Sequence, residues 1–90
     1  MMNETEYLLT CLSEECAEIA KQASKGIRFG LGDFEPGQSE TNTRRIEREL
    51  ADLLAVAERL GFHIRHEDKS AKHDKLIKYM GISRQLGTLK

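Results

Sequence analysis

Two segments with the apolar periodicity of a helix, separated by a glycine-rich stretch, constrain the fold of this chain most strongly. The first apolar stripe consists of Leu8, Leu12, Ile19 and Ala23. The second consists of Ile46, Leu50, Leu53, Ala57 and Leu60. Residues 26–38 between them hold four glycines and the only proline, which is typical of a loop. No segment alternates as a strand would, so the chain is predicted to be all-α.

The two long helices have recognisable ends. We expect the first to run from about Glu4 to Lys25, with Asn3 and Glu6 forming a capping box and Gly26 ending it. We expect the second to run over about residues 42–60. Its candidate caps are Thr41, Asn42 and Thr43, with Gly61 after its end.

A third, weaker helical pattern covers about Asp68 to Met80, and Gly81 either ends or interrupts it. The whole chain, residues 1–90, is therefore predicted to be one domain. It should contain two long antiparallel helices, a shorter third helix and a glycine-rich loop over residues 27–40.

The small size of the chain predicts self-association. With 32% charged residues and no Trp, it has little material for a core of its own. Cys11 and Cys16 are five residues apart on one helix and point about 140° apart, so they cannot form a disulfide with each other. No Cys/His spacing suits zinc either. We therefore expect a homo-oligomer, a dimer or a tetramer, to complete the helical bundle.

Charge and hydropathy exclude two classes of partner. A net charge of -1 gives no electrostatic reason for nucleic-acid binding. No segment approaches the roughly 18 apolar residues of a membrane span. The first residues also lack the pattern of a signal peptide, and we expect a cytoplasmic protein.

Four carboxylates lie where a structural helix should be apolar. On a wheel of about 100° per residue, Glu15 falls inside the first apolar stripe and Glu18 at its edge. On the second helix, Glu49 lies between the stripe and Asp52. Each helix therefore presents an acid pair at i, i+3 along or beside the face that it should bury, and neighbours at this spacing converge.

Such acids need a compensating charge. An ionised carboxylate is costly to bury without a partner, and two facing pairs repel each other. A divalent cation removes both penalties, and carboxylate oxygens are ligands that Mg²⁺ prefers. We expect Mg²⁺, for which Mn²⁺ can substitute. The alternative is ordinary salt bridges from Arg44, Arg45 and Arg48.

The segments Glu14-Glu15-Cys-Ala-Glu18 and Glu49-Leu-Ala-Asp52 resemble the signature of the MazG-like family of all-α nucleoside triphosphate pyrophosphohydrolases. The resemblance implies that Glu15, Glu18, Glu49 and Asp52 are metal ligands and catalytic residues. It also implies Mg²⁺-dependent cleavage of a nucleoside triphosphate into a nucleoside monophosphate and pyrophosphate.

The weaker candidates for substrate binding are Lys75, Lys78 and Phe29. Lys72, Lys75 and Lys78 recur every three residues, and the resemblance favours Lys75 and Lys78 as phosphate contacts, from the same or a neighbouring subunit. The alternative is a solvated helix face. Phe29, in the glycine-rich stretch, can stack on a base or pack the loop down.

The acids are compatible with two other classes of protein. In the first, the chain is a non-catalytic helical oligomerisation or interaction module, whose folding is indifferent to magnesium. In the second, it is a di-iron carboxylate bundle, but no Glu has a His three residues after it, as those sites require.

Overall fold

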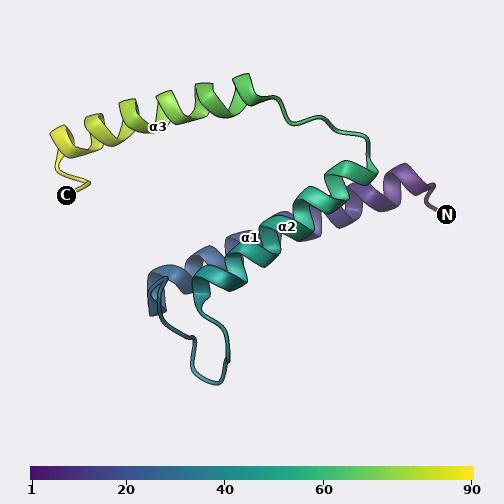
Figure 1. Cartoon of the computed structure of the whole chain (residues 1–90), viewed down its shortest axis with the longest axis horizontal. Coiled ribbons are helices and arrows are strands. Elements are labelled where there is room, and N and C mark those ends of the chain that lie inside the picture. Colours follow the sequence, from purple (N-terminus) through teal and green to yellow (C-terminus); the bar gives the residue numbers. More distant parts are fainter.

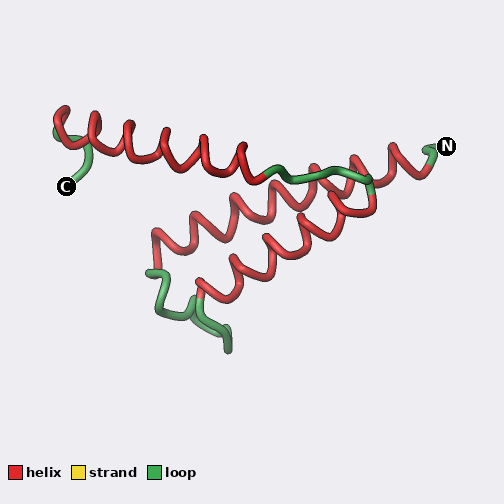
Figure 2. The backbone as a smooth tube through the Cα atoms, turned by 45° about the horizontal axis from the view of Figure 1, so that its top comes forward, coloured by secondary structure: helices red, strands yellow, loops and turns green.

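The computed structural model describes residues 1–90 and consists of three helices without a strand, which confirms the predicted all-α class. Helix α1 spans Glu4–Phe29, α2 spans Asn42–Arg59 and α3 spans His66–Leu86. Helices α1 and α2 pack along each other as an antiparallel hairpin, and α3 extends away from it (Figure 1). Figure 2 shows the same hairpin from another side, with the 30–41 loop closing one end.

The first helix begins where the sequence predicted and ends later. Asn3 Oδ1 accepts a hydrogen bond of 2.8 Å from the Glu6 backbone N–H. The prediction that Gly26 ends the helix was wrong, because Gly26 lies inside α1 and is buried. A Cβ at Gly26 would lie 3.1 Å from Leu31 Cδ2, so its missing side chain permits close packing. The cap is instead Gly30, with φ of 87°, and the loop therefore begins at residue 30 rather than 27.

The second helix follows its prediction closely. Thr41 is its N-cap, and its hydroxyl accepts a hydrogen bond of 3.2 Å from the Arg44 backbone N–H. Leu60 is the C-cap and Gly61 follows with φ of 79°. Of its apolar stripe, Ala57 is buried, whereas Leu50 stays 44% exposed.

The third helix is longer than predicted. It has 21 residues against 18 in α2, so the expectation of a shorter third helix was wrong. The helix continues through Gly81 and ends at Gly87, which has the left-handed φ of 79° that favours glycine at this position. Gly81 is compatible with a helix interior, at a cost relative to alanine.

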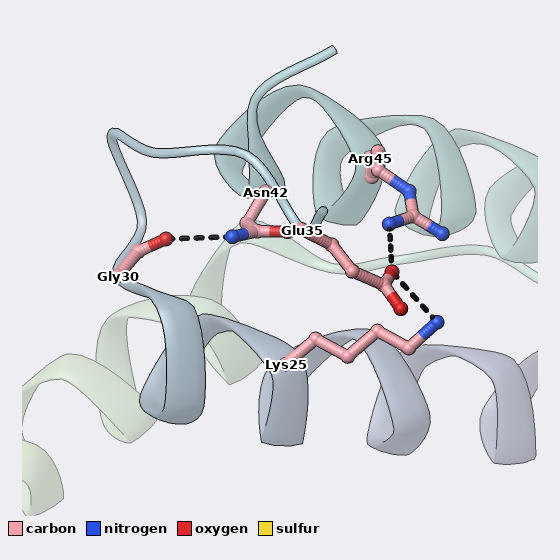
Figure 3. A network of polar contacts seen from close by, with 5 residues as sticks. All are labelled: Lys25, Gly30, Glu35, Asn42 and Arg45. Carbon is pink, nitrogen blue, oxygen red and sulfur yellow. Dashed lines mark hydrogen bonds and ion pairs between the residues drawn. The ribbon is translucent and has the colours of Figure 1, made fainter. Parts of the chain in front are cut away.

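The 30–41 loop is anchored to the start of α2 (Figure 3). The Asn42 side chain is fully buried, and its Nδ2 donates a hydrogen bond of 2.8 Å to the Gly30 carbonyl. The backbone N–H groups of Asn42 and Thr43 donate to the carbonyls of Asp33 and Leu31, both at 2.9 Å. These bonds satisfy backbone groups at the end of α1 and the start of α2 that have no hydrogen-bond partner within their own helix.

The single chain has almost no core. Ala57 is its only buried hydrophobic residue. No Cα atom of α3 lies within 8 Å of one in α1 or α2. None of the three helices contains an apolar stretch that is long enough to cross a membrane.

Candidate functional site

Three of the four predicted carboxylates meet between the two helices of the hairpin. Glu15 of α1 and Glu49 and Asp52 of α2 each place one carboxylate oxygen so that all three oxygens lie within 4.8 Å of one another. Glu15 and Glu49 are half-buried and Asp52 is exposed. The antiparallel packing therefore assembles an acidic cluster from two helices that a long loop separates in sequence.

Glu15 is the most perturbed member of this cluster. Its Oε2 is shielded from solvent and has no hydrogen-bond partner. Partial burial, followed by the negative charges of Asp52 and Glu49, raises the pKa of Glu15 above its usual value of 4.5. In the absence of a cation, the fold therefore disfavours the ionised form of this carboxyl.

Glu18 lies outside the group of three. Its side chain is exposed on α1, one turn after Glu15, and it is not among the residues whose oxygens meet. Its negative charge is nevertheless near enough to contribute to the raised pKa of Glu15. Glu18 therefore borders the cluster from its solvent side.

The arginines pair with loop glutamates rather than with the cluster. Glu35 Oε2 lies 2.6 Å from Arg45 Nη1 and 3.0 Å from Lys25 Nζ, so one loop carboxylate joins both helices (Figure 3). Arg48 pairs with Glu40. No ion pair in this structure joins an arginine to a carboxylate of the cluster, so the alternative in which arginine salt bridges neutralise these acids is not observed.

These ion pairs shift the pKa values of the loop carboxyls in the direction opposite to the shift of Glu15. Hydrogen bonds from Arg45 and Lys25 lower the pKa of Glu35 below 4.5. Arg48 does the same to the pKa of Glu40. The charges of Asp52 and Glu49 also help to raise the pKa of Arg48, after the larger effect of Glu40. The Arg48 guanidinium thus lies near the cluster but forms its ion pair with Glu40.

The predicted substrate-binding residues lie away from the cluster. Lys75 and Lys78 belong to α3, which contacts neither helix of the hairpin, and Lys78 Nζ lies 5.7 Å from the ring centroid of its neighbour Tyr79. Phe29 is the last residue of α1 rather than part of the loop, and the Arg28 guanidinium lies 5.3 Å from its ring centroid. Within one chain these three side chains do not join the carboxylates.

Sequence reasoning missed two polar residues that shape the hairpin. Gln22, two turns after Glu15 on α1, is only 5% exposed, and its Oε1 has no hydrogen-bond partner. Asn42 was considered only as a cap, although it anchors the loop. Helical spacing could have placed Gln22 beside the Glu15 stripe, whereas the Asn42–Gly30 bond depends on a loop geometry that has no local sequence signal.

Comparison with known proteins adds no relative. No protein-family model, no curated protein and no solved structure matches this chain.

Proposed function

We propose that this chain is a Mg²⁺-dependent nucleoside triphosphate pyrophosphohydrolase. The observation that carries the proposal is the convergence of Glu15, Glu49 and Asp52, with oxygens within 4.8 Å of one another. The likeness of the EExxE and ExxD steps to the MazG-like signature gives the reaction class. The products are a nucleoside monophosphate and pyrophosphate.

The three carboxylates fit a hard divalent cation. Their oxygens are the donors that Mg²⁺ takes, and the shielded Glu15 Oε2 lacks any protein donor. Glu15, Glu49 and Asp52 would hold the ion, with Glu18 at the border of the site. When bound, Mg²⁺ neutralises phosphate charge and lowers the pKa of a coordinated water.

The chain's own residues provide the remaining functions. One of the carboxylates of the site would accept the proton of the attacking water. The Arg48 guanidinium interacts electrostatically with Asp52 and Glu49, so it would add positive charge near the phosphates. Lys75 and Lys78 would contact phosphates, and Phe29 the base, only from a second subunit or after a rearrangement.

Pyrophosphate release tests the proposal directly. A panel of standard and modified nucleoside triphosphates is incubated with Mg²⁺, with Mn²⁺ and with chelator. We expect metal-dependent release that Glu49→Gln reduces to the level seen in chelator. Glu47→Gln, an exposed acid two residues earlier on the same helix, is the matched control and should keep the wild-type rate.

A second readout separates metal binding from turnover. Mg²⁺ should raise the Tm of the wild-type protein, because it binds the folded state alone. Glu15→Gln should abolish that increase and raise the Tm in chelator, because it removes a carboxylate whose ionised form the fold disfavours. A normal rate in Glu49→Gln, or an unchanged Mg²⁺ effect in Glu15→Gln, would contradict the assignment.

The alternative is a non-catalytic helical interaction module. The specific observation in its favour is the apolar surface that the chain leaves open, including Leu54 at 50% and Leu86 at 73% exposure. It predicts an intact oligomer that releases no pyrophosphate from any nucleotide and whose Tm does not respond to Mg²⁺.

A further inference from the structure

The two parts of the chain carry opposite charge. Residues 1–64, which contain the hairpin, hold seven Lys or Arg and twelve Asp or Glu, a net charge of -5. Residues 65–90, which contain α3, hold seven Lys or Arg and three Asp or Glu, a net charge of +4. The net charge of -1 is therefore an average over two parts of opposite sign, and the expectation of no nucleic-acid partner rested on that average.

The position of α3 keeps its positive charge from being cancelled by the hairpin. Figures 1 and 2 both show α3 extending away from α1 and α2, and no Cα atom of α3 lies within 8 Å of one in either helix. Exposed charges further apart than a Debye length, about 8 Å at physiological ionic strength, are largely screened from each other. The acids of the hairpin therefore neutralise little of the charge on α3.

Three lysines of α3 share one side of the helix. At about 100° per residue they fall within a sector about 120° wide, and the N-cap Arg65 lies one turn before the first of them. The basic face is defined as Arg65, Lys69, Lys72 and Lys75. All four side chains are exposed and none forms an ion pair. They form a row of free cations about 15 Å long.

Two of the three acids of α3 lie on the other side of the helix. Glu67 and Asp74 are about 140° and 160° from Lys72, and only Asp68 falls within the sector of the lysines. The basic face therefore keeps four positive charges against one negative charge.

Tyr79 extends the basic face toward the C-terminus. It falls within the same sector and is 56% exposed, and Lys78 Nζ lies 5.7 Å from its ring centroid. An exposed aromatic ring beside a row of cations is suited to stacking on a base.

The apolar residues of α3 argue against a membrane surface as the partner. A helix that lies on a membrane needs its apolar side chains gathered on one face. The exposed side chains of Leu76, Ile77 and Ile82 instead lie about 100–140° from one another around α3. A nucleic-acid backbone requires only the positive face.

We propose that the basic face of α3 binds the phosphate backbone of a nucleic acid, without reading its sequence. A row of cations neutralises the regularly spaced phosphates and releases their counterions, which favours binding. The hairpin, with its net charge of -5, is repelled by the same backbone, so the contact is made through α3. The interaction does not depend on whether the acidic cluster binds metal or turns over a nucleotide.

Fluorescence anisotropy with a labelled, random-sequence DNA duplex tests this proposal. Chelator is present throughout, so that no metal bound to the acids contributes. Four phosphate contacts predict that affinity falls roughly 150-fold between 50 and 200 mM salt. Lys72→Gln with Lys75→Gln should remove two contacts and so about halve the slope of log affinity against log salt concentration. Helicity by circular dichroism checks that this variant is folded.

Charge reversal provides the matched comparison. Lys72→Glu with Lys75→Glu should abolish binding. Lys21→Glu with Arg44→Glu changes the net charge equally, at exposed positions of the hairpin without an ion pair, and should retain most of it. Equal losses in the two variants would overturn the basic face as the binding surface.

Three further outcomes would overturn the proposal. The first is no binding of the duplex at 50 mM salt. The second is binding that does not respond to salt, since phosphate contacts must release counterions. The third is tighter binding to phosphatidylserine vesicles than to the duplex, which would assign the basic face to a membrane surface instead.

Discussion

Glu15 occupies the centre of the surface that α1 turns toward α2, a position where leucine would add to the core. Its carboxyl is flanked by Glu49 and Asp52, and its pKa is raised as a result. A side chain that lowers the stability of the fold in this way is expected at functional sites, where several groups with perturbed pKa values collect. At the residue scale, the acidic cluster is therefore the part of the molecule least explained by folding alone.

Glu35 shows the opposite electrostatics and makes a pH prediction. Its pKa is lower in the folded state than the usual 4.5, because Arg45 and Lys25 stabilise its ionised form. The unfolded chain therefore binds more protons in this range. The stabilisation is fully present above a pH of about 4.5, and it is lost as the pH falls through the pKa of Glu35 in the folded state.

We expect Glu35→Gln to weaken the dependence of the free energy of unfolding on pH between about 5 and 3. The measurement is urea unfolding at stepped pH values. Glu47→Gln, an exposed acid without an ion pair, is the control and should keep the wild-type dependence. Identical profiles for the wild type and Glu35→Gln would show that the Lys25–Glu35–Arg45 contacts do not stabilise the hairpin. Glu40, paired with Arg48, should account for part of the acid sensitivity that remains.

At the scale of the element, glycine determines where the helices end, through its φ angle rather than its mere presence. Gly26 and Gly81 lie inside α1 and α3, whereas Gly30 and Gly87 have φ of 87° and 79° at the helix ends. Gly26 lies where the side chains of Leu31 and Ile46 pack close to the backbone of α1. A Cβ at Gly81 would meet no atom within 4 Å, so nothing in the chain requires glycine there.

A matched pair of substitutions follows from this contrast. Gly81→Ala should stabilise α3 by about 0.5–1 kcal/mol and increase the helical signal in far-ultraviolet circular dichroism. Gly87→Ala should reduce that signal or leave the end of α3 frayed, because alanine is strained at positive φ. A loss of helicity in Gly81→Ala would mean that a partner packs closely against this glycine.

On the scale of the whole molecule, the chain is a hairpin with a third helix that touches neither of the other two. Ala57 is the single buried hydrophobic residue, although the chain carries three well-formed helices. Most helical stability in proteins comes from packing an apolar face rather than from helix propensity. A molecule with this little internal packing would gain stability from a partner that covers its exposed apolar residues.

Concentration should therefore control thermal stability. If the exposed apolar residues of the hairpin pair two copies, dissociation accompanies unfolding, and the Tm should rise as the protein concentration increases from about 1 to 100 μM. Differential scanning fluorimetry or circular dichroism measures this directly. Leu54→Glu, which places a charge at an exposed leucine of α2, should lower the Tm and remove its dependence on concentration. A constant Tm for the wild type would indicate unfolding of a monomer.

The sequence by itself determined the all-α class of this protein and the approximate positions of the two hairpin helices. Helical periodicity placed α1 and α2, Asn3 marked the start of α1 and the segment 41–43 that of α2, and the absence of alternation excluded strands. These properties are local, because the partners of each hydrogen bond in a helix are four residues apart. Wheel geometry also identified Glu15 and Glu49 as acids on inward-facing surfaces, since the same period decides which side chains share a face.

Only the tertiary structure decided which of these side chains meet. The pairing of α1 with α2 brings Glu15 to Asp52 and leaves Glu18 at the border, and it sets the Lys25–Glu35–Arg45 contacts. It also assigned Gly26 to close packing instead of a helix end. Such outcomes depend on the register and rotation of one helix against another, and these are set by contacts between residues far apart in sequence.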